Sequence, residues 1–260
     1  MSRRKTNYKT RRTLGVITFL LVAIAIVLSN PESYETVWTR KDNPESTNLE
    51  PLGVSTTNIE GNELLIKATD VLARLPVKGR APKTGYSRNQ FYETWPSIDG
   101  CSLRQHIIKR EMGDTAVISS EDNCSVISGE YDEPYTGSHL IFYQKSDFTS
   151  GIQIDHVVSL SDAWQKGAQN LSVDERYELA TDPLNLIAVD SKANQNKADG
   201  DAATWLPPNK SFRCAYVARQ VSVKHKYNLW VTAAEKETME NILNRCPDEP
   251  AVGISDLNNI

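Results

Sequence analysis

Apolar residues recur along this chain with two different spacings, and each spacing predicts a different kind of element. Between residues 62 and 75 they follow helical spacing, which predicts the first helix of a folded domain. The runs 139–146 and 152–160 are rich in β-branched and aromatic residues, as is typical of strands. Turn-forming residues at 147–151 separate the two runs, so we expect a hairpin there.

The rest of the pattern predicts mainly helices. We expect helices at residues 161–168, 172–180, 190–198, 212–227 and 232–246. Ser172 and Glu175 fit a capping box at the start of the second of these helices. A short apolar run at 184–189 predicts one more strand, and Asp190 or Ser191 is expected to cap the helix that follows it. We therefore predict an α+β fold that is mostly helical.

The first residues show a different pattern, that of an export segment. Residues 1–13 carry six Lys or Arg and no acid, and residues 14–29 are apolar and uncharged. A basic flank before an apolar run is typical of a secretory signal or an N-terminal anchor. As a helix, residues 14–29 would span about 24 Å, slightly less than a hydrocarbon core of ~30 Å. Because no clear small-residue cleavage site follows, we slightly favour an uncleaved anchor in the membrane.

The orientation of this segment sets the localisation of the rest. Positive flanks stay in the cytoplasm, so we expect everything after about residue 30 to be extracellular or at the cell surface. Residues 30–60 are rich in Asn, Pro, Ser, Thr and Glu and predict a flexible linker. Residues 61–246, roughly 185 in number, are enough for one domain with its own core. Residues 247–260 are expected to form a tail.

Charge limits the partners that this domain can have. The whole chain has a formal charge of −4, and removing the six cations of residues 1–13 leaves −10. Such a domain repels nucleic acid unless a local basic surface or a metal compensates. Residues 202–234 contain five Lys or Arg and no acid, so they predict either a solvated helix face or a phosphate-binding surface. We take Lys210, Arg213 and Arg219 as candidates for phosphate contact.

The four cysteines add a second constraint. In an exported domain Cys101, Cys124, Cys214 and Cys246 are expected to be oxidised. Four cysteines allow three pairings, and the local pairs Cys101–Cys124 and Cys214–Cys246 are favoured over the others. Free buried thiols are the alternative. The absence of a C-x-x-C spacing argues against a structural zinc site.

The candidate chemistry begins in the segment IQIDHVVSLSDAW, where Asp155 and His156 stand at the end of a predicted strand. Neighbouring side chains can converge there because the backbone bends. Asp155 and the amide oxygen of Asn194 are ligands that suit Mg²⁺ or a similar hard ion. His156 can accept a proton from water near neutral pH. Asn185 is expected to brace the His156 loop by hydrogen bonding.

For several other residues the sequence context gives less support for a role in the site. Lys197 follows Asn194 by three residues on the same helix, so it can share that face and meet a phosphate oxygen. Arg88, in the GYSR loop, is a further candidate for substrate contact. His106 and His139 are expected to be structural. Trp164 and Trp205 are expected in the core rather than against bases.

These residues carry a resemblance to a known family. The segments IDHVVSLSDAW, DPLNLIAVDSKANQNK and WLPP resemble HNH nucleases with a β-β-α metal motif. They are most similar to exported HNH proteins related to the C-terminal domain of the GmrSD restriction enzymes. GYSRNQF…W…DGC and NKSFRCAYVARQVSVKHKYNLWV extend the resemblance to residues 61–246, with the core motif at 139–200. The resemblance implies an HNH core embedded in a mostly helical domain.

The resemblance also implies an activity, a metal-dependent endonuclease that cleaves nucleic acid, with DNA favoured over RNA. His156 would be the general base, and Asp155 and Asn194 would bind one divalent metal. Asn185 matches the Asn in the middle of the HNH motif. Mg²⁺ is favoured, with Mn²⁺ or Ca²⁺ as alternatives. At the last position of the motif this chain has Asn194, where the name HNH implies a histidine.

Two alternatives remain beside this activity. The first is a catalytically silent, membrane-tethered binding domain on the same scaffold. The second is an antibacterial nuclease toxin, which the absence of a recognisable delivery domain disfavours. No protein partner is inferred from the sequence.

Overall fold

The computed structural model describes residues 66–143 and 151–252, which lie within one compact unit, Gly53–Ile260. The predicted export segment, the predicted linker and residues 147–150 of the predicted turn lie outside the described residues. None of the helices in the two described ranges combines the length and the apolar character that crossing a membrane requires.

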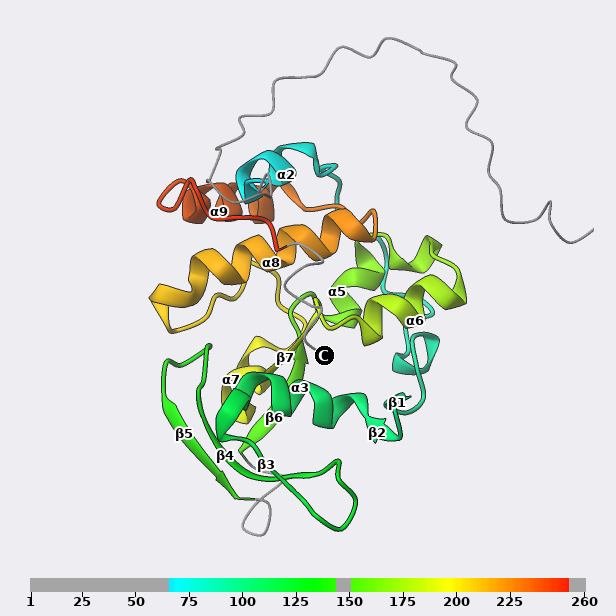
Figure 1. The fold of residues 1–260 in the computed structure, drawn as a ribbon. Coiled ribbons are helices and arrows are strands. Elements are labelled where there is room, and N and C mark those ends of the chain that lie inside the picture. The colour runs from blue at the N-terminus through cyan, green and yellow to red at the C-terminus, as the bar shows by residue number, and fades with distance from the viewer. Residues whose placement is uncertain (1–65, 144–150, 253–260) are drawn as a thin grey trace, which may run out of the picture. The chain divides into compact units, whose positions relative to one another are not determined.

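The described residues confirm an α+β fold in which helices predominate over small antiparallel sheets (Figure 1). The helices are α2 (Ala68–Arg74), α3 (Leu103–Met112), α5 (Leu160–Gln165), α6 (Val173–Thr181), α7 (Ser191–Lys197), α8 (Arg213–Lys226) and α9 (Ala233–Leu243). The strands are β1 (Ser97–Ile98), β2 (Cys101–Ser102), β3 (Val117–Ile118), β4 (Val126–Asp132), β5 (His139–Tyr143), β6 (Ile152–His156) and β7 (Leu186–Asp190). Short 3-10 turns lie at η2 (Arg88–Gln90), η3 (Gly113–Thr115), η4 (Ala168–Asn170) and η5 (Lys210–Phe212).

The helix starts follow the local chemistry of the sequence. The predicted capping box of Ser172 and Glu175 opens α6, and a second one opens α9. Asp190 caps α7 by accepting a hydrogen bond from the backbone N–H of Ala193 at 2.7 Å, which decides between the two expected caps. The first helix is shorter than predicted, because Lys67 is in a β-bridge with Pro250. Side-chain acceptors therefore define several helix boundaries here.

The predicted hairpin between β5 and β6 is wrong. Strand β5 pairs with β4, which the sequence pattern did not reveal, and β6 pairs antiparallel with β7. In that ladder Ile152 lies opposite Asp190 and His156 lies opposite Leu186. The apolar run of β7 can be buried on both of its faces only at the centre of the domain, and β6 is the strand that it pairs with there.

The β6–β7 ladder packs between α3 and the layer of α8 (Figure 1). Ile152, Ile154, Leu186 and Ala188 face α3, whereas Ile187 and Val189 join the cluster formed with α2, α8 and α9. Side chains alternate between the two faces of a strand, and residues paired across a ladder share a face. Asp155, opposite Ile187, therefore points to the α8 side, and His156, opposite Leu186, points to the α3 side.

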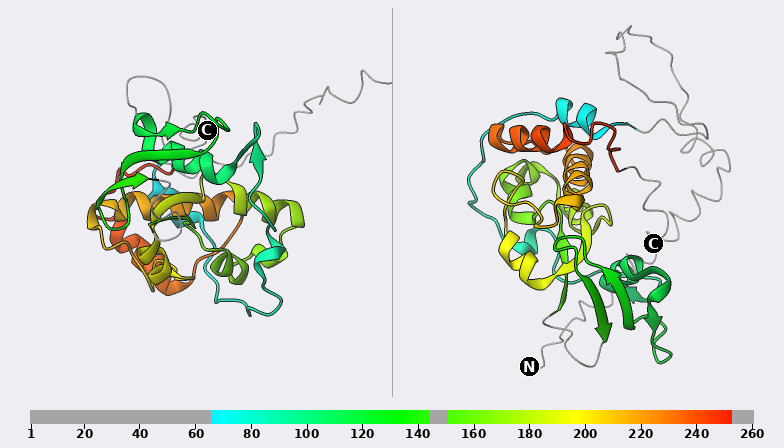
Figure 2. Two further views of the ribbon diagram at one scale, coloured as in Figure 1. Left: turned by 90° about the horizontal axis from the view of Figure 1, so that it is seen from below. Right: turned by 90° about the vertical axis from the view of Figure 1, so that its left-hand side faces the viewer.

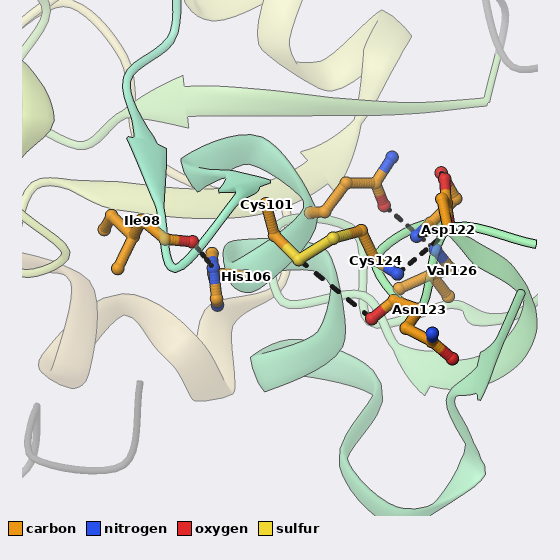
Figure 3. Close-up of a disulfide and its surroundings, with 9 residues drawn as sticks. Ile98, Cys101, His106, Asp122, Asn123, Cys124 and Val126 are labelled. Carbon is orange, nitrogen blue, oxygen red and sulfur yellow. Dashed lines mark hydrogen bonds between the residues drawn. A yellow bond between two sulfur atoms is a disulfide. The ribbon is translucent and has the colours of Figure 1, made fainter.

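Both expected cysteine pairs form disulfides in the structure. Cys101–Cys124 joins β2 to the segment before β4, next to a contact of His106 Nε2 with the carbonyl oxygen of Ile98 at 3.0 Å (Figure 3). Cys214–Cys246 joins the first turn of α8 to the segment after α9. The β3–β4–β5 sheet lies on the side of the domain opposite α2 and α9 (Figure 2). Each disulfide therefore stabilises a different half of the fold.

The segment after α9 belongs to the folded domain. The backbone N–H of Ala68 donates to the carbonyl oxygen of Glu249 at 2.9 Å, and that of Ala251 donates to Ile66 at 2.8 Å. The backbone N–H of Val252 also donates to the hydroxyl of Ser222. The contacts of the domain thus continue past residue 246, where we expected a tail to begin.

Six charged side chains form an ion cluster between the helices, which we call the buried ion cluster because all of its members except Arg80 are buried. Its members are Arg80, Asp162, Lys166, Asp201, Lys224 and Glu235, three cations and three carboxylates. Lys166 Nζ lies 2.7 Å from Asp162, 2.7 Å from Asp201 and 2.6 Å from Glu235. Lys224 adds contacts with Asp162 at 3.3 Å and with Glu235 at 3.1 Å. The cluster joins α5, α8 and α9 to two loops, and its charges balance.

Removing one cation from this cluster should be costly. Lys166→Met leaves three buried carboxylates with two cations, so we expect the free energy of unfolding to fall by about 3–5 kcal/mol. Chemical denaturation followed by circular dichroism measures this change.

A surface ion pair provides the matched control. Lys83 and Asp199 are 3.1 Å apart, with about half of each side chain exposed. Lys83→Met should therefore change the free energy of unfolding by at most about 1 kcal/mol. Equal effects of the two substitutions would show that the cluster does not stabilise the fold in this way.

Candidate active site

Asp155 is enclosed by a tyrosine and a lysine on the α8 side of β6. The hydroxyl of Tyr135 donates to Asp155 Oδ2 at 2.6 Å, and burial next to this carboxylate raises the pKa of Tyr135 far above its usual value. Lys197 Nζ lies 2.9 Å from Oδ2 and 3.1 Å from Oδ1, and it also donates to the carbonyl oxygen of His156 at 2.8 Å. The negative charge of Asp155 is thus balanced inside the protein.

The helix α7 brings Asn194 to the same face of β6. Asn194 Nδ2 donates to the side-chain oxygen of Gln153 at 2.9 Å, and Gln153 precedes Asp155 by two residues on that strand. Lys197, one helical turn after Asn194, reaches Asp155 itself. The structure therefore brings the expected metal ligands Asp155 and Asn194 to one face of β6, although nearly forty residues separate them in sequence.

The donor chemistry on this face fits a hard divalent cation. Asp155 offers a carboxylate, while Asn194 and Gln153 offer amide oxygens, and Mg²⁺ is usually held by one or two carboxylates with water completing its shell. Among the described residues Cys214, Cys246 and Glu249 also lie close together. Those two cysteines form a disulfide, so they offer no thiolate to a metal.

His156 lies on the other face of the strand, in an aromatic enclosure. Its ring stacks on Trp95 at a centroid distance of 6.2 Å and an interplanar angle of 8°, and it lies 6.1 Å from the Tyr92 ring. Its Nε2 is 2.9 Å from the carbonyl oxygen of Ala180. Because a carbonyl oxygen only accepts, Nε2 must carry the proton, and Nδ1 of the neutral ring keeps its lone pair.

The surroundings of His156 also keep its ring neutral. The residue is 5% exposed, and this burial, together with the charges of Arg88 and Lys197, lowers its pKa to about 3. An imidazole with such a pKa is unprotonated throughout the physiological range. Its Nδ1 therefore keeps a lone pair at neutral pH.

Asn185 holds the chain that directly follows His156. Its side-chain oxygen accepts from the backbone N–H of Val158 at 2.8 Å, and its amide group donates to the carbonyl oxygens of Val158 and Leu179. Its own carbonyl oxygen accepts from Val157. These bonds brace the loop after the histidine through its backbone.

The side chains of Asp155 and His156 have separate sets of contacts. Tyr135 and Lys197 surround the carboxylate, whereas Trp95, Tyr92 and the carbonyl of Ala180 surround the imidazole. Lys197 links the two residues, since it binds the side chain of one and the backbone of the other. The two groups are thus adjacent at the strand end but face different layers of the domain, so the convergence of their side chains that we expected there is wrong.

The residues that we expected to bind phosphate do not all lie at the surface. The ammonium of Lys197 is fully buried against Asp155. Arg219 donates to the carbonyl oxygens of Pro183, Leu184 and Leu186, and burial lowers its pKa to about 10. Lys210 is exposed, and Arg213 is half-buried with its Nε donating to the carbonyl oxygen of Pro207.

The basic stretch 202–234 is therefore not one continuous cationic surface. Lys224 belongs to the buried ion cluster, and Arg219 is bound to backbone carbonyls. Trp164 and Trp205 pack in or against the core, as expected. His139 is exposed on β5 and pairs with Asp132, away from any enclosed site.

Four residues of this site were not named from the sequence. Gln153 could have been found from its position two residues before Asp155, because such residues share a strand face. Tyr92 and Trp95 lie in the resemblance segment around GYSR, but nothing local places them against His156. Tyr135 has no sequence signal, since only the fold brings it to Asp155.

Comparison with known proteins adds a family relationship. Residues 103–242 match the family described as GmrSD restriction endonucleases, C-terminal domain. A protein of Arthroderma benhamiae described as an uncharacterized secreted protein is 36% identical over 182 residues, which is 69% of this chain and 84% of that protein. No solved structure matches the chain. Asp155, His156, Asn185 and Asn194 lie inside the matched region.

The enclosure of His156 predicts an unusual titration. At about pH 5, below the ordinary histidine pKa of ~6.5, His156 should remain neutral in nuclear magnetic resonance spectra of the ring carbons. His139 is the internal control, because its hydrogen bond to Asp132 raises its pKa and it should be charged at that pH. A charged His156 at about pH 5 would contradict the enclosure.

The same shift has a consequence for stability. The pKa of His156 is lower in the folded state than in the unfolded chain, so protonation opposes folding. Its contribution to stability should be complete above about pH 6.5 and should be lost as the pH falls towards about 3. The pH dependence of denaturation in the wild type and in His156→Gln measures this contribution by difference.

Proposed function

Because this chain belongs to the family of the GmrSD restriction endonuclease C-terminal domain, we propose that it is a metal-dependent endonuclease that hydrolyses phosphodiester bonds of nucleic acid. The HNH type of mechanism, with His156 as general base, is part of this proposal. DNA is the favoured substrate, as it is the substrate of restriction endonucleases.

The observation that carries the proposal is the state of the His156 ring. A general base must be unprotonated at working pH and must have a lone pair to offer. The carbonyl of Ala180 accepts from Nε2–H, which leaves Nδ1 as the ring nitrogen that carries the lone pair. His156 also lies at the end of a strand, beside the carboxylate of Asp155.

In the proposed reaction the protein positions the base and the phosphate, and water supplies the nucleophile. His156 Nδ1 takes one proton from a water molecule while the water oxygen forms a bond to phosphorus. The bond from phosphorus to the leaving sugar oxygen breaks, and that oxygen takes a proton from solvent. Asn185 keeps the base in place, because it holds the backbone on the C-terminal side of the histidine.

Asp155 and Asn194 are the residues that would hold the metal. A bound divalent cation would act as a Lewis acid and stabilise negative charge on the phosphate. Lys197 contacts both oxygens of Asp155, so it sets the direction in which the carboxylate faces. Mg²⁺ is the ion that this oxygen set suits best, and Mn²⁺ has similar requirements.

Export is part of the same proposal. The Arthroderma benhamiae relative is described as secreted, and both cysteine pairs of this chain form disulfides, which persist in oxidising compartments. Basic and apolar residues precede the domain, as in a signal or anchor. We therefore place the activity outside the cell.

One observation favours the second candidate, a silent binding domain. The ammonium of Lys197 already neutralises Asp155, as it would in a protein that binds no metal there. The two candidates differ in metal binding and in cleavage, and both can be measured.

Cleavage tests the assignment of the base. Wild-type protein should nick plasmid DNA in Mg²⁺ and should lose this activity in EDTA. His156→Gln should lower the rate by roughly 10²–10⁴-fold, the usual contribution of general acid–base catalysis. The matched control is His139→Gln, a change at an exposed histidine that should leave the rate unchanged. Full activity of His156→Gln with retained thermal stability would remove His156 from the reaction.

Metal binding can be tested without any cleavage. Titration of Mn²⁺ followed by electron paramagnetic resonance should show one bound ion in the wild type. Asp155→Asn should weaken this binding by roughly tenfold or more, because it removes the only carboxylate of the ligand set. Asp199→Asn, at a surface carboxylate paired with Lys83, is the control and should bind as the wild type does. Unchanged binding in Asp155→Asn would exclude Asp155 as a ligand.

A further inference from the structure

The cations nearest to this site already have partners in the protein, so they are not available to bind a substrate phosphate. Lys197 is bound to Asp155, and Arg219 is bound to three carbonyl oxygens. Lys166 is fully buried in the ion cluster, and Arg80, although partly exposed, is paired with Asp162 and Asp201. A nucleic acid that approaches His156 must therefore meet a different positive group.

Arg88 is such a group, and it lies outside the family match. It opens η2, before the matched residues 103–242, and its side chain is exposed. Its guanidinium lies over the Tyr92 ring with Cζ 5.2 Å from the centroid, and it donates to the Tyr92 hydroxyl. Within residues 66–143 and 151–252, no carboxylate forms an ion pair with it.

Tyr92 connects Arg88 with the histidine. The Tyr92 ring is 7% exposed and lies 6.1 Å from the His156 ring, and Trp95 packs against both rings. The same aromatic side chain therefore supports the guanidinium and forms part of the enclosure of the base. This arrangement fixes Arg88 at the rim of the enclosure.

The segment that carries Arg88 is held firmly in place. Arg176 Nε donates to the carbonyl oxygen of Gln90 at 2.9 Å, and Phe91 packs edge-to-face on Trp164 at 6.2 Å. Trp164 Nε1 also donates to the carbonyl oxygen of Thr84. A guanidinium fixed by its own ring contact and by an anchored segment loses little freedom when it binds a phosphate.

We propose that Arg88 binds a backbone phosphate of the nucleic acid next to the bond that His156 helps to cleave. The segment around η2 is then a part of the active site that lies before the family domain. A guanidinium suits this role because it can bind two phosphate oxygens at once. This inference rests on the proposed function, since it needs nucleic acid as the substrate.

The test separates binding from cleavage. Fluorescence anisotropy of a labelled DNA duplex is measured with His156→Gln protein, which cannot cleave, with and without Arg88→Gln. The added substitution should weaken binding by roughly tenfold or more, the usual effect of a lost charge-assisted hydrogen bond. It should also lower the slope of log affinity against log salt by about one. Arg88→Lys should restore the slope but only part of the affinity.

Four results would overturn the inference. Arg74→Gln, at an exposed arginine on α2, is the matched control and should change neither the affinity nor the salt slope. An equal loss of affinity in Arg74→Gln would show that the effect of Arg88→Gln comes from net charge and not from a specific contact. Unchanged binding and an unchanged slope in Arg88→Gln would exclude the contact. If wild-type protein neither binds nor cleaves DNA in Mg²⁺, the proposed function fails and the inference fails with it. Cleavage by the wild type with full activity of Arg88→Gln would overturn the inference alone.

Discussion

The β6–β7 ladder is covered by helices on both faces, so every polar side chain on it must find its partners inside the protein. Asp155 finds them in Lys197 and Tyr135, and His156 finds one in the carbonyl of Ala180. Burial thus decides both the ion pair of the carboxylate and the neutral state of the imidazole. The chemistry that we propose for the strand end depends on this one constraint.

The helices that cover the ladder are positioned by charges as well as by apolar packing. The buried ion cluster joins α5, α8 and α9, and its three carboxylates balance its three cations. Buried ion pairs stabilise a fold only weakly in net terms, but removal of one partner is expensive. The cluster therefore restricts the arrangement of these helices, and with it the layer against which Ile187 and Val189 pack.

The same internal use of charge changes how the site can meet a polyanion. Lys197 and Arg219, which lie against β6 and β7, are bound to a carboxylate and to carbonyl oxygens, so they contribute little to the surface. Arg88 differs because its contacts are with the ring and the hydroxyl of Tyr92 rather than with a carboxylate, and its side chain is exposed. In our proposal, a segment before the matched residues 103–242 supplies the contact with the phosphate.

Much of the local structure could be read from the sequence. Helical spacing and cap residues such as Ser172 and Asp190 predicted most helices, because these signals act over a few neighbouring residues. The neighbouring Asp155 and His156 at a strand end, with Asn185 and Asn194 further on, identified the candidate site. The pairing of β6 with β7 rather than β5 could not be predicted, because alternation shows which face is buried but not which strand lies alongside.

What the sequence by itself determined was the set of local elements, the chemical types at the site and their order along the chain. Only the tertiary structure decided that Asp155 and His156 face different layers, that Lys197 and Arg219 turn inward, and that Tyr135 reaches the carboxylate. The physical reason is that the type of a charged residue does not show whether its charge will be solvated by water or paired with a buried group. Its partner is chosen only when segments far apart in the chain pack together.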